Sequence, residues 1–112
     1  MSKEYTVFML VKTTPTWLAL TPPQRFAFLG EAIQPILRKH PAVNMRFFDA
    51  EAFNATTSDV VMWQTHDLLQ YESVVEHLRE TPFWDRYFNV NNILLSRENA
   101  YAEHYKVAAI QV

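Results

Sequence analysis

The sequence predicts one α+β domain, in which an antiparallel sheet carries two helices on one face. Four short segments rich in β-branched and aromatic residues predict the strands, and two segments with apolar residues at helical spacing predict the helices. The composition agrees, because 112 residues of which 49% are hydrophobic are enough to build a single core.

The first strand is expected over residues 5–12, where both faces carry apolar side chains. The first helix is expected to begin at Thr21, because an N-cap threonine is followed by two prolines and then by Gln24 at the third helical position. Pro35 predicts a kink in this helix or a broken last turn, and Pro41 predicts its end. One buried stripe is predicted at the apolar positions that recur at helical spacing: Phe26, Leu29, Ile33, Ile36 and Leu37.

Two further strands are expected over residues 42–49 and 59–65, joined by a polar loop. A second helix is expected to start with Asp67 as its N-cap and to end before Pro82. A last strand is expected over residues 88–95. The resulting β-α-β-β-α-β order is the ferredoxin-like arrangement, a four-stranded antiparallel sheet with both helices on one face.

Residues 1–97 therefore account for the whole predicted ferredoxin-like domain. Residues 98–112 form a C-terminal extension, in which Tyr105, Val107 and Ala109 alternate with more polar neighbours. This weak alternation fits either an added strand or a tail, and the sequence leaves both open.

The scarcity of glycine and the lack of cysteine exclude several kinds of site. Gly30 is the only glycine, so glycine-rich phosphate loops and dinucleotide fingerprints are excluded. Without cysteine, neither disulfides nor thiolate metal sites can form. The four histidines are too far apart in the sequence for a local chelate, and we predict no metal and no cofactor. Gly30 itself falls inside the first helix, where it would mark a close approach to the sheet or ease the bend towards Pro35.

The charge pattern argues against nucleic-acid and membrane partners. The formal net charge is −2 and there is no run of lysine or arginine, whereas nucleic-acid binders usually carry a basic patch. Residues 1–4 are polar, and the apolar run over residues 5–11 is too short to span a membrane. We therefore expect a cytoplasmic protein with neither kind of partner.

The second face of the predicted sheet carries too many apolar side chains to meet water. Two helices can cover only one face, and an uncovered apolar patch of this size is unusual on a monomer. A second, identical sheet packed against it about a two-fold axis is the economical solution. We therefore predict a homodimer with its sheets face to face.

Several segments resemble the darcynin family of small bacterial proteins. The resemblance is carried by residues 47–53, 59–65 and 78–84, with Tyr5-Thr6-Val7-Phe8 and Pro15-Thr16-Trp17-Leu18 in support. It implies an architecture like the dimeric α/β-barrel group, which includes cofactor-free monooxygenases, haem-binding enzymes, polyketide cyclases and isomerases. The family supplies no functional residues to transfer, and fold analogy alone cannot select one of these activities.

Two residues are weak candidates for chemistry. His66 follows the third strand at one end of the sheet, where a neutral imidazole could act as a general base, or the side chain could be structural or face solvent. Arg46 lies among apolar residues and could anchor a carboxylate or phenolate, or form a structural salt bridge. Asp49 and Glu51 share a face if extended and could do acid–base work, although turn and solvation roles are commoner at such a position.

The excess of aromatic residues predicts a pocket between sheet and helices for an apolar or aromatic small molecule. Under this hypothesis the protein is a binding protein or a cofactor-free oxygenase, cyclase or isomerase. A haem-binding barrel protein and a non-catalytic interaction module are the alternatives. The residues expected to line the pocket are Phe8, Arg46, Phe48, Trp63, His66, Tyr71 and Trp84.

Overall fold

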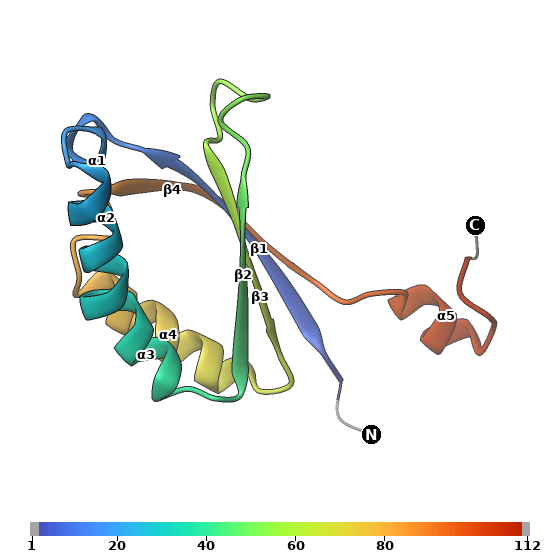
Figure 1. Cartoon of the computed structure of the whole chain (residues 1–112). Coiled ribbons are helices and arrows are strands. Elements are labelled where there is room, and N and C mark those ends of the chain that lie inside the picture. Colours follow the sequence, from blue (N-terminus) through green and yellow to red (C-terminus); the bar gives the residue numbers. More distant parts are fainter. Residues whose placement is uncertain (1–2, 111–112) are drawn as a thin grey trace.

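The computed structural model describes residues 3–110 and contains one four-stranded antiparallel sheet (Figure 1). Its strands lie in the order β2-β3-β1-β4, which is the ferredoxin-like order, and the predicted fold class is confirmed. The bounds of the strands are Tyr5–Thr13 for β1, Val43–Asp49 for β2, Asp59–Thr65 for β3 and Phe88–Ser96 for β4.

The helices between the strands all lie on one side of this sheet (Figure 1). Between β1 and β2, four short segments follow one another: α1, α2, the π-helix η1 and α3. We call α2, η1 and α3 together the first helical rod. The bounds are Pro15–Leu18 for α1, Pro22–Phe28 for α2, Leu29–Ile33 for η1, Gln34–Arg38 for α3 and Leu68–Arg79 for α4. No helix within residues 3–110 is long and apolar enough to cross a membrane.

The predicted start of the first helical rod is observed, and the expected irregularity near Pro35 is present as a change in helix type. The hydroxyl of Thr21 accepts a hydrogen bond from the backbone N–H of Gln24, and the Gln24 side chain accepts one from the Thr21 N–H. The kink takes the form of η1, after which Pro35 lies in the first turn of α3, where its missing N–H is tolerated. A Cβ added to Gly30 would meet nothing within 4 Å, so the expected close approach to the sheet is wrong.

Only part of the predicted buried stripe is buried. Ile33 and Ile36 are 5% and 8% exposed, whereas Phe26 is 70% and Leu29 is 38% exposed. The early turns of the rod therefore stand away from the sheet. The core lies instead between the sheet and α4, and its most buried members are Val7, Met9, Val11, Val61, Trp63, Val74 and Leu78.

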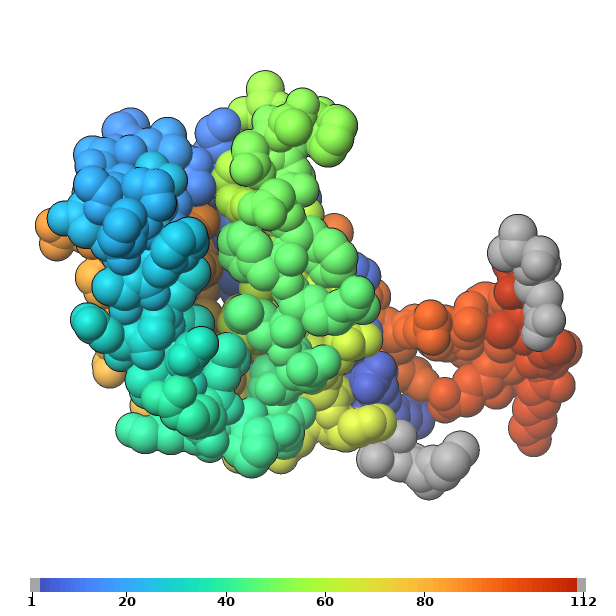
Figure 2. All heavy atoms as spheres, viewed as in Figure 1, coloured from blue at the N-terminus to red at the C-terminus, as the bar shows by residue number. Residues whose placement is uncertain are grey.

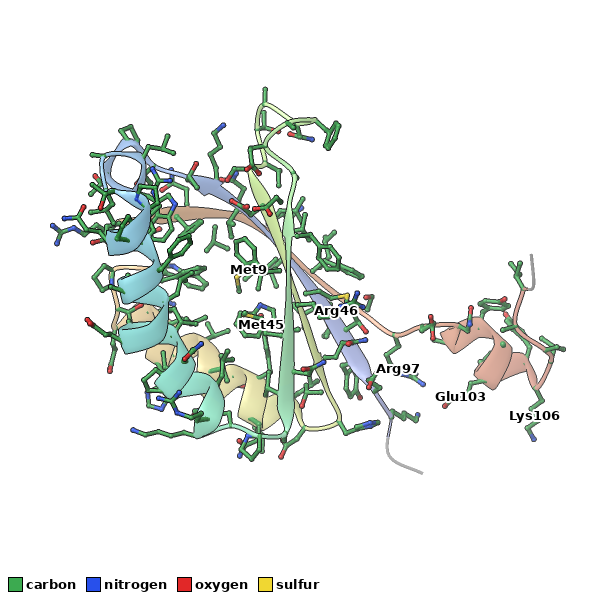
Figure 3. All side chains as sticks on the ribbon, in the orientation of Figure 1. Met9, Met45, Arg46, Arg97, Glu103 and Lys106 are labelled. Atoms are coloured by element: carbon green, nitrogen blue, oxygen red, sulfur yellow. The ribbon has the colours of Figure 1, made fainter. Side chains whose placement is uncertain are left out.

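The face of the sheet away from the helices carries apolar side chains at its centre, and we call it the open face. One row across it follows the pairs Arg46–Met62, Met62–Phe8 and Phe8–Leu94, and the next row contains Phe48, Val60, Leu10 and Asn92. The row on the other side is polar and contains Asn44, Gln64, Thr6 and Ser96, so the predicted apolar character holds only for the centre of this face. Figure 3 shows Met45 on the helix side of β2 and Arg46 on the open face.

Strand β4 contains a bulge opposite the middle of β1. Val11 pairs with Val90 and the preceding Leu10 pairs with Asn92, so Asn91 is an extra residue in β4. A bulge of this kind bends the strand and increases its local twist.

Within the described residues, the C-terminal extension forms no added strand and projects from the sheet (Figure 1). Ala100–Tyr105 is a short helix, α5, that projects from the end of β4 on the side of the sheet opposite the other helices (Figures 1 and 2). The radius of gyration of 16.0 Å exceeds the value of about 13 Å expected for a compact chain of this length. The sequence alternation was misleading because it covers only a few residues.

Candidate functional site

A cleft lies between the first helical rod and β2, because the early turns of the rod do not pack on the sheet. Its volume is about 700 Å³, and it opens on the side of the molecule where β2 is the edge strand. The cleft exists because α4 covers the centre of the sheet, while the rod approaches the sheet closely only at Ile33 and Ile36.

The two long walls of the cleft are apolar and face each other. The rod contributes Phe26, Leu29 and Ile33, and β2 contributes Met45 and Phe47. Phe47 is 43% exposed although it lies on the helix side of the sheet, because no helix packs directly on it. An apolar surface of this kind in a concave site is what a small-molecule pocket usually presents.

The end of the cleft near α1 is closed by aromatic rings. Trp17 is buried, with its ring centre 5.0 Å from that of Phe88 and 5.9 Å from that of Phe28. Arg25 lies at this end and donates hydrogen bonds to the carbonyl oxygens of Trp17 and Leu18. This guanidinium is thereby held as part of the wall.

Three carboxyl groups converge where β2 and β3 meet the loop between them. Asp49 and Asp59 are directly opposite each other in the β2–β3 pairing, and Glu51 follows in the loop. Their nearest oxygens lie within 4.8 Å of one another, and all three residues line the cleft. Like charges directly opposite on a sheet are destabilising, so the sheet tolerates this pair at a cost.

Burial raises the pKa of Asp59 from 3.8 to about 6, with the Asp49 and Glu51 carboxylates adding to the effect. The Ser58 hydroxyl donates a 2.8 Å hydrogen bond to Asp59 Oδ2 and opposes the shift. A carboxyl group with such a pKa can accept or release a proton near neutral pH. Together the three groups could also hold a hard cation through oxygen ligands. Lys12 lies nearby but donates its hydrogen bond to the Ala55 carbonyl.

The seven residues that the sequence nominated for the pocket do not converge on this cleft, and none of them lines it. Phe8, Arg46 and Phe48 lie on the open face of the sheet. There the Arg46 guanidinium lies over the Phe48 ring, with its Cζ 5.2 Å from the ring centre. No ion pair of Arg46 is present within residues 3–110, so the expected salt bridge is not observed.

The other nominated residues are dispersed around the core. His66 is exposed, with its Nε2 3.7 Å from a carboxylate oxygen of Glu4. Trp63 is buried and Tyr71 meets it edge-on, while Trp84 stacks with the Arg79 guanidinium. Trp63 borders a separate small cavity of about 30 Å³, and its indole N–H has no hydrogen-bond partner among the described residues.

Sequence reasoning missed most of the cleft because it assigned the rod's apolar positions to the core. The helical spacing of Phe26 and Leu29 was recognised, but spacing alone does not show whether a helix touches the sheet. The pairing of Asp49 with Glu51 was noticed as well. Asp59 completes the cluster only through strand pairing, which no local pattern in the sequence reveals.

The fold is similar to that of much longer solved structures. A chlorite dismutase variant from Candidatus Nitrospira defluvii matches with a TM-score of 0.77 at 18% identity, over 95% of this chain and 44% of that one. A structure described as a novel heme-binding protein from Thermus thermophilus matches with a TM-score of 0.71 at 17% identity, over 87% and 40%. The chain thus spans less than half the length of these proteins. The likeness identifies a dimeric α/β-barrel type of fold.

The donor set of the cleft does not fit haem. Haem iron is usually held by histidine, cysteine or tyrosine, or by methionine paired with histidine, and none of the four histidines lines the cleft. His40 is buried elsewhere, with its two ring nitrogens hydrogen-bonded to the Ile36 carbonyl and to Ser73. The carboxylates at the end of the cleft would also repel the propionates of a haem.

Curated relatives match most of the chain. A darcynin homolog from Granulibacter bethesdensis is 53% identical over 106 residues, which are 94% of this chain and 86% of that protein. A darcynin homolog from Streptomyces avermitilis is 46% identical over 101 residues, which are 89% and 84%. The family model described as "Darcynin, domain of unknown function" matches residues 1–112. The chain therefore belongs to the darcynin family.

Proposed function

We propose that this protein binds an apolar or aromatic small molecule in the cleft between β2 and the first helical rod. The observation that carries the proposal is a concave space of about 700 Å³ with apolar side chains on both long walls. Binding pockets for small molecules typically have volumes of roughly 300–1,000 Å³ and a few polar groups that orient the ligand.

The polar groups of the cleft favour a ligand with a cationic or hydrogen-bond-donating end. Asp49, Glu51 and Asp59 concentrate carboxyl oxygens at one end. The lining cations, Lys12 and Arg25, already donate hydrogen bonds to backbone carbonyl groups. Arg46, once expected to anchor an anion, faces the other side of the sheet. Aromatic amines are therefore better candidates than aromatic acids.

The test is a binding measurement with matched pairs of ligands and variants. A set of aromatic amines and the corresponding carboxylic acids is titrated calorimetrically at pH 7.5. We expect the amines to bind, and we expect Phe47→Asn in the apolar wall to weaken binding by at least about tenfold, since it replaces an apolar contact by an unpaired polar group without adding a charge. Leu69→Asn is the control, because Leu69 is 75% exposed on α4 and outside the cleft. Equal binding by both variants would contradict the proposal.

A second candidate function is proton transfer on such a ligand, and the raised pKa of Asp59 favours it. Asp59 in its ionised form would accept a proton from a donor group held at the end of the cleft. Asp59→Asn should abolish turnover of a cleft ligand but weaken its binding only in part, because Asp49 and Glu51 still offer carboxyl oxygens to the ligand. If turnover is found and survives this substitution, Asp59 is not the base.

The open face supports a homodimer as the functional form. Its central residues, such as Phe8 and Leu94, are 36% and 47% exposed in the single chain, and they lie in a continuous apolar row with Met62. The similar solved structures have chains more than twice as long as the part that matches, and a second copy would supply a comparable length. Sedimentation velocity at micromolar concentration should show a dimer, and Leu94→Asp should shift it towards monomer.

A further inference from the structure

We propose that residues 97–110 form an arm that clasps the second copy of this chain in the dimer. The inference rests on the homodimer proposed above and assigns a role to a segment that this proposal does not use. The arm comprises α5 and the residues on either side of it.

The position of the arm points to this role. α5 lies on the same side of the sheet as the open face, and it stands clear of the strands (Figures 1 and 2). A second sheet packed on the open face would occupy the space beside the arm. The partner would therefore be held between the open face and α5.

The arm carries more exposed apolar surface than a solvated extension needs. Tyr105 is 70% exposed, Val107 is 57% exposed and Ile110 is 79% exposed. Contiguous apolar groups on a projecting element usually mark an interaction site. Two charged groups of the arm, by contrast, are paired within their own chain: Glu103 pairs with Arg97 and with Lys3.

The arm is a built element with a defined internal structure. Its last residues fold back on α5, where the Val107 N–H donates to the Ala102 carbonyl and the Ile110 N–H donates to the Tyr101 hydroxyl. Ala102 is 7% exposed beneath this turn. Figure 3 shows Arg97 just after β4 and Glu103 on α5, and their ion pair links the end of the sheet to the arm.

The size of the open face indicates why an arm would be needed. All four strands share the pairing over residues 6–11 of β1. With strands about 4.8 Å apart and residues about 3.4 Å apart, this region has a footprint of roughly 300–400 Å². A stable interface buries about 800 Å² on each partner. The exposed apolar side chains of the arm would supply part of the interface area that the open face lacks.

The test uses the fact that the sequence contains no cysteine, so that an introduced one is unique. Val107→Cys is labelled with a benzophenone maleimide and irradiated at a concentration where sedimentation shows the dimer. We expect a covalent dimer on a denaturing gel. Leu69→Cys, on the exposed surface of α4, is the matched control and should give only monomer.

A second measurement compares dimer dissociation constants. We expect the double substitution Tyr105→Asp with Ile110→Asp to raise the constant by about tenfold or more, since it charges the contact surface, and Leu69→Asp to leave it within about twofold. If the dimer gives no crosslink through the arm and the double substitution leaves its dissociation constant unchanged, the clasp is overturned. The open-face dimer then remains supported. A wild-type chain that stays monomeric overturns the dimer itself.

Discussion

The two halves of the helix-covered face differ sharply in how they are packed. Under α4, Val74 and Leu78 are 0% and 1% exposed, and they press on the centre of the sheet. Under the early turns of the first helical rod, Leu29 and Phe47 are 38% and 43% exposed across an open cleft. The same sheet thus supports a closed core on one half and an accessible apolar site on the other. The closed half provides the stability that lets the other half remain open.

The largest expected effect tests whether stability resides in the closed half. Leu78→Ala should lower the free energy of unfolding by about 2–5 kcal/mol, because it leaves a cavity in packed surroundings. Leu29→Ala should cost less than about 1 kcal/mol, since this side chain faces the cleft. Urea unfolding followed by tryptophan fluorescence measures both. Equal losses would mean that the cleft is closed in solution.

The carboxyl pair of Asp49 and Asp59 should make the free energy of unfolding depend on pH. The pKa of Asp59 is raised in the folded state, so the folded chain holds this proton more tightly than the unfolded chain does. The contribution of protonated Asp59 to the free energy of unfolding is fully present below pH 3.8. It is lost as the pH rises through the folded-state pKa of about 6. Because Asp49 and Glu51 are exposed and solvent screens the repulsion, we expect a loss of about 1–2 kcal/mol.

Asp59→Asn removes this titration and serves as the measurement. The difference in unfolding free energy between Asp59→Asn and the wild type should grow in favour of the variant between pH 4 and pH 7. Taking the difference between the two proteins cancels the contribution of the other carboxyl groups to the pH dependence of the unfolding free energy. A constant difference over that range would show that Asp59 titrates normally.

An effect of similar size is expected where the two halves are joined. His40 bridges them, with Nδ1 2.7 Å from the Ile36 carbonyl on α3 and Nε2 2.9 Å from the Ser73 hydroxyl on α4. Since Nδ1 must donate to the carbonyl, Nε2 accepts from the hydroxyl. Ser73→Ala leaves this buried nitrogen without its partner and should cost about 1–2 kcal/mol. Thermal unfolding at pH 7.5 measures the loss, and an unchanged midpoint would place the junction elsewhere.

The smallest expected effect is a gain in the open half. A Cβ on Gly30 meets nothing within 4 Å, and glycine inside a helix costs about 0.5–1 kcal/mol relative to alanine. Gly30→Ala should therefore raise the free energy of unfolding by up to that amount. A loss of stability instead would show that η1 needs the freedom of glycine to form before Pro35.

The sequence was sufficient for the fold and insufficient for the site, for a physical reason. Strand alternation and the capping residues Thr21 and Asp67 are local features, and the structure places strands and helix starts where they predicted. The cleft depends instead on how far α2 stands from β2, and the carboxyl cluster depends on Asp49 pairing with Asp59. Neither the separation of α2 from β2 nor this pairing can be predicted from a short segment of sequence. Aromatic residues such as Trp63 were therefore assigned to a pocket when they belong to the core.

The bulge at Asn91 decides which side chains of β4 reach each side of the sheet. With the extra residue, Ile93 pairs with Met9 and Leu94 pairs with Phe8. If Asn91 paired with Leu10 in a regular ladder instead of bulging, every following residue of β4 would move by one position and exchange faces. Asn92 would then oppose Met9 on the helix-covered side, and Leu94 would leave the open face. The bulge at Asn91 thus keeps one asparagine out of the core and one leucine in the proposed interface.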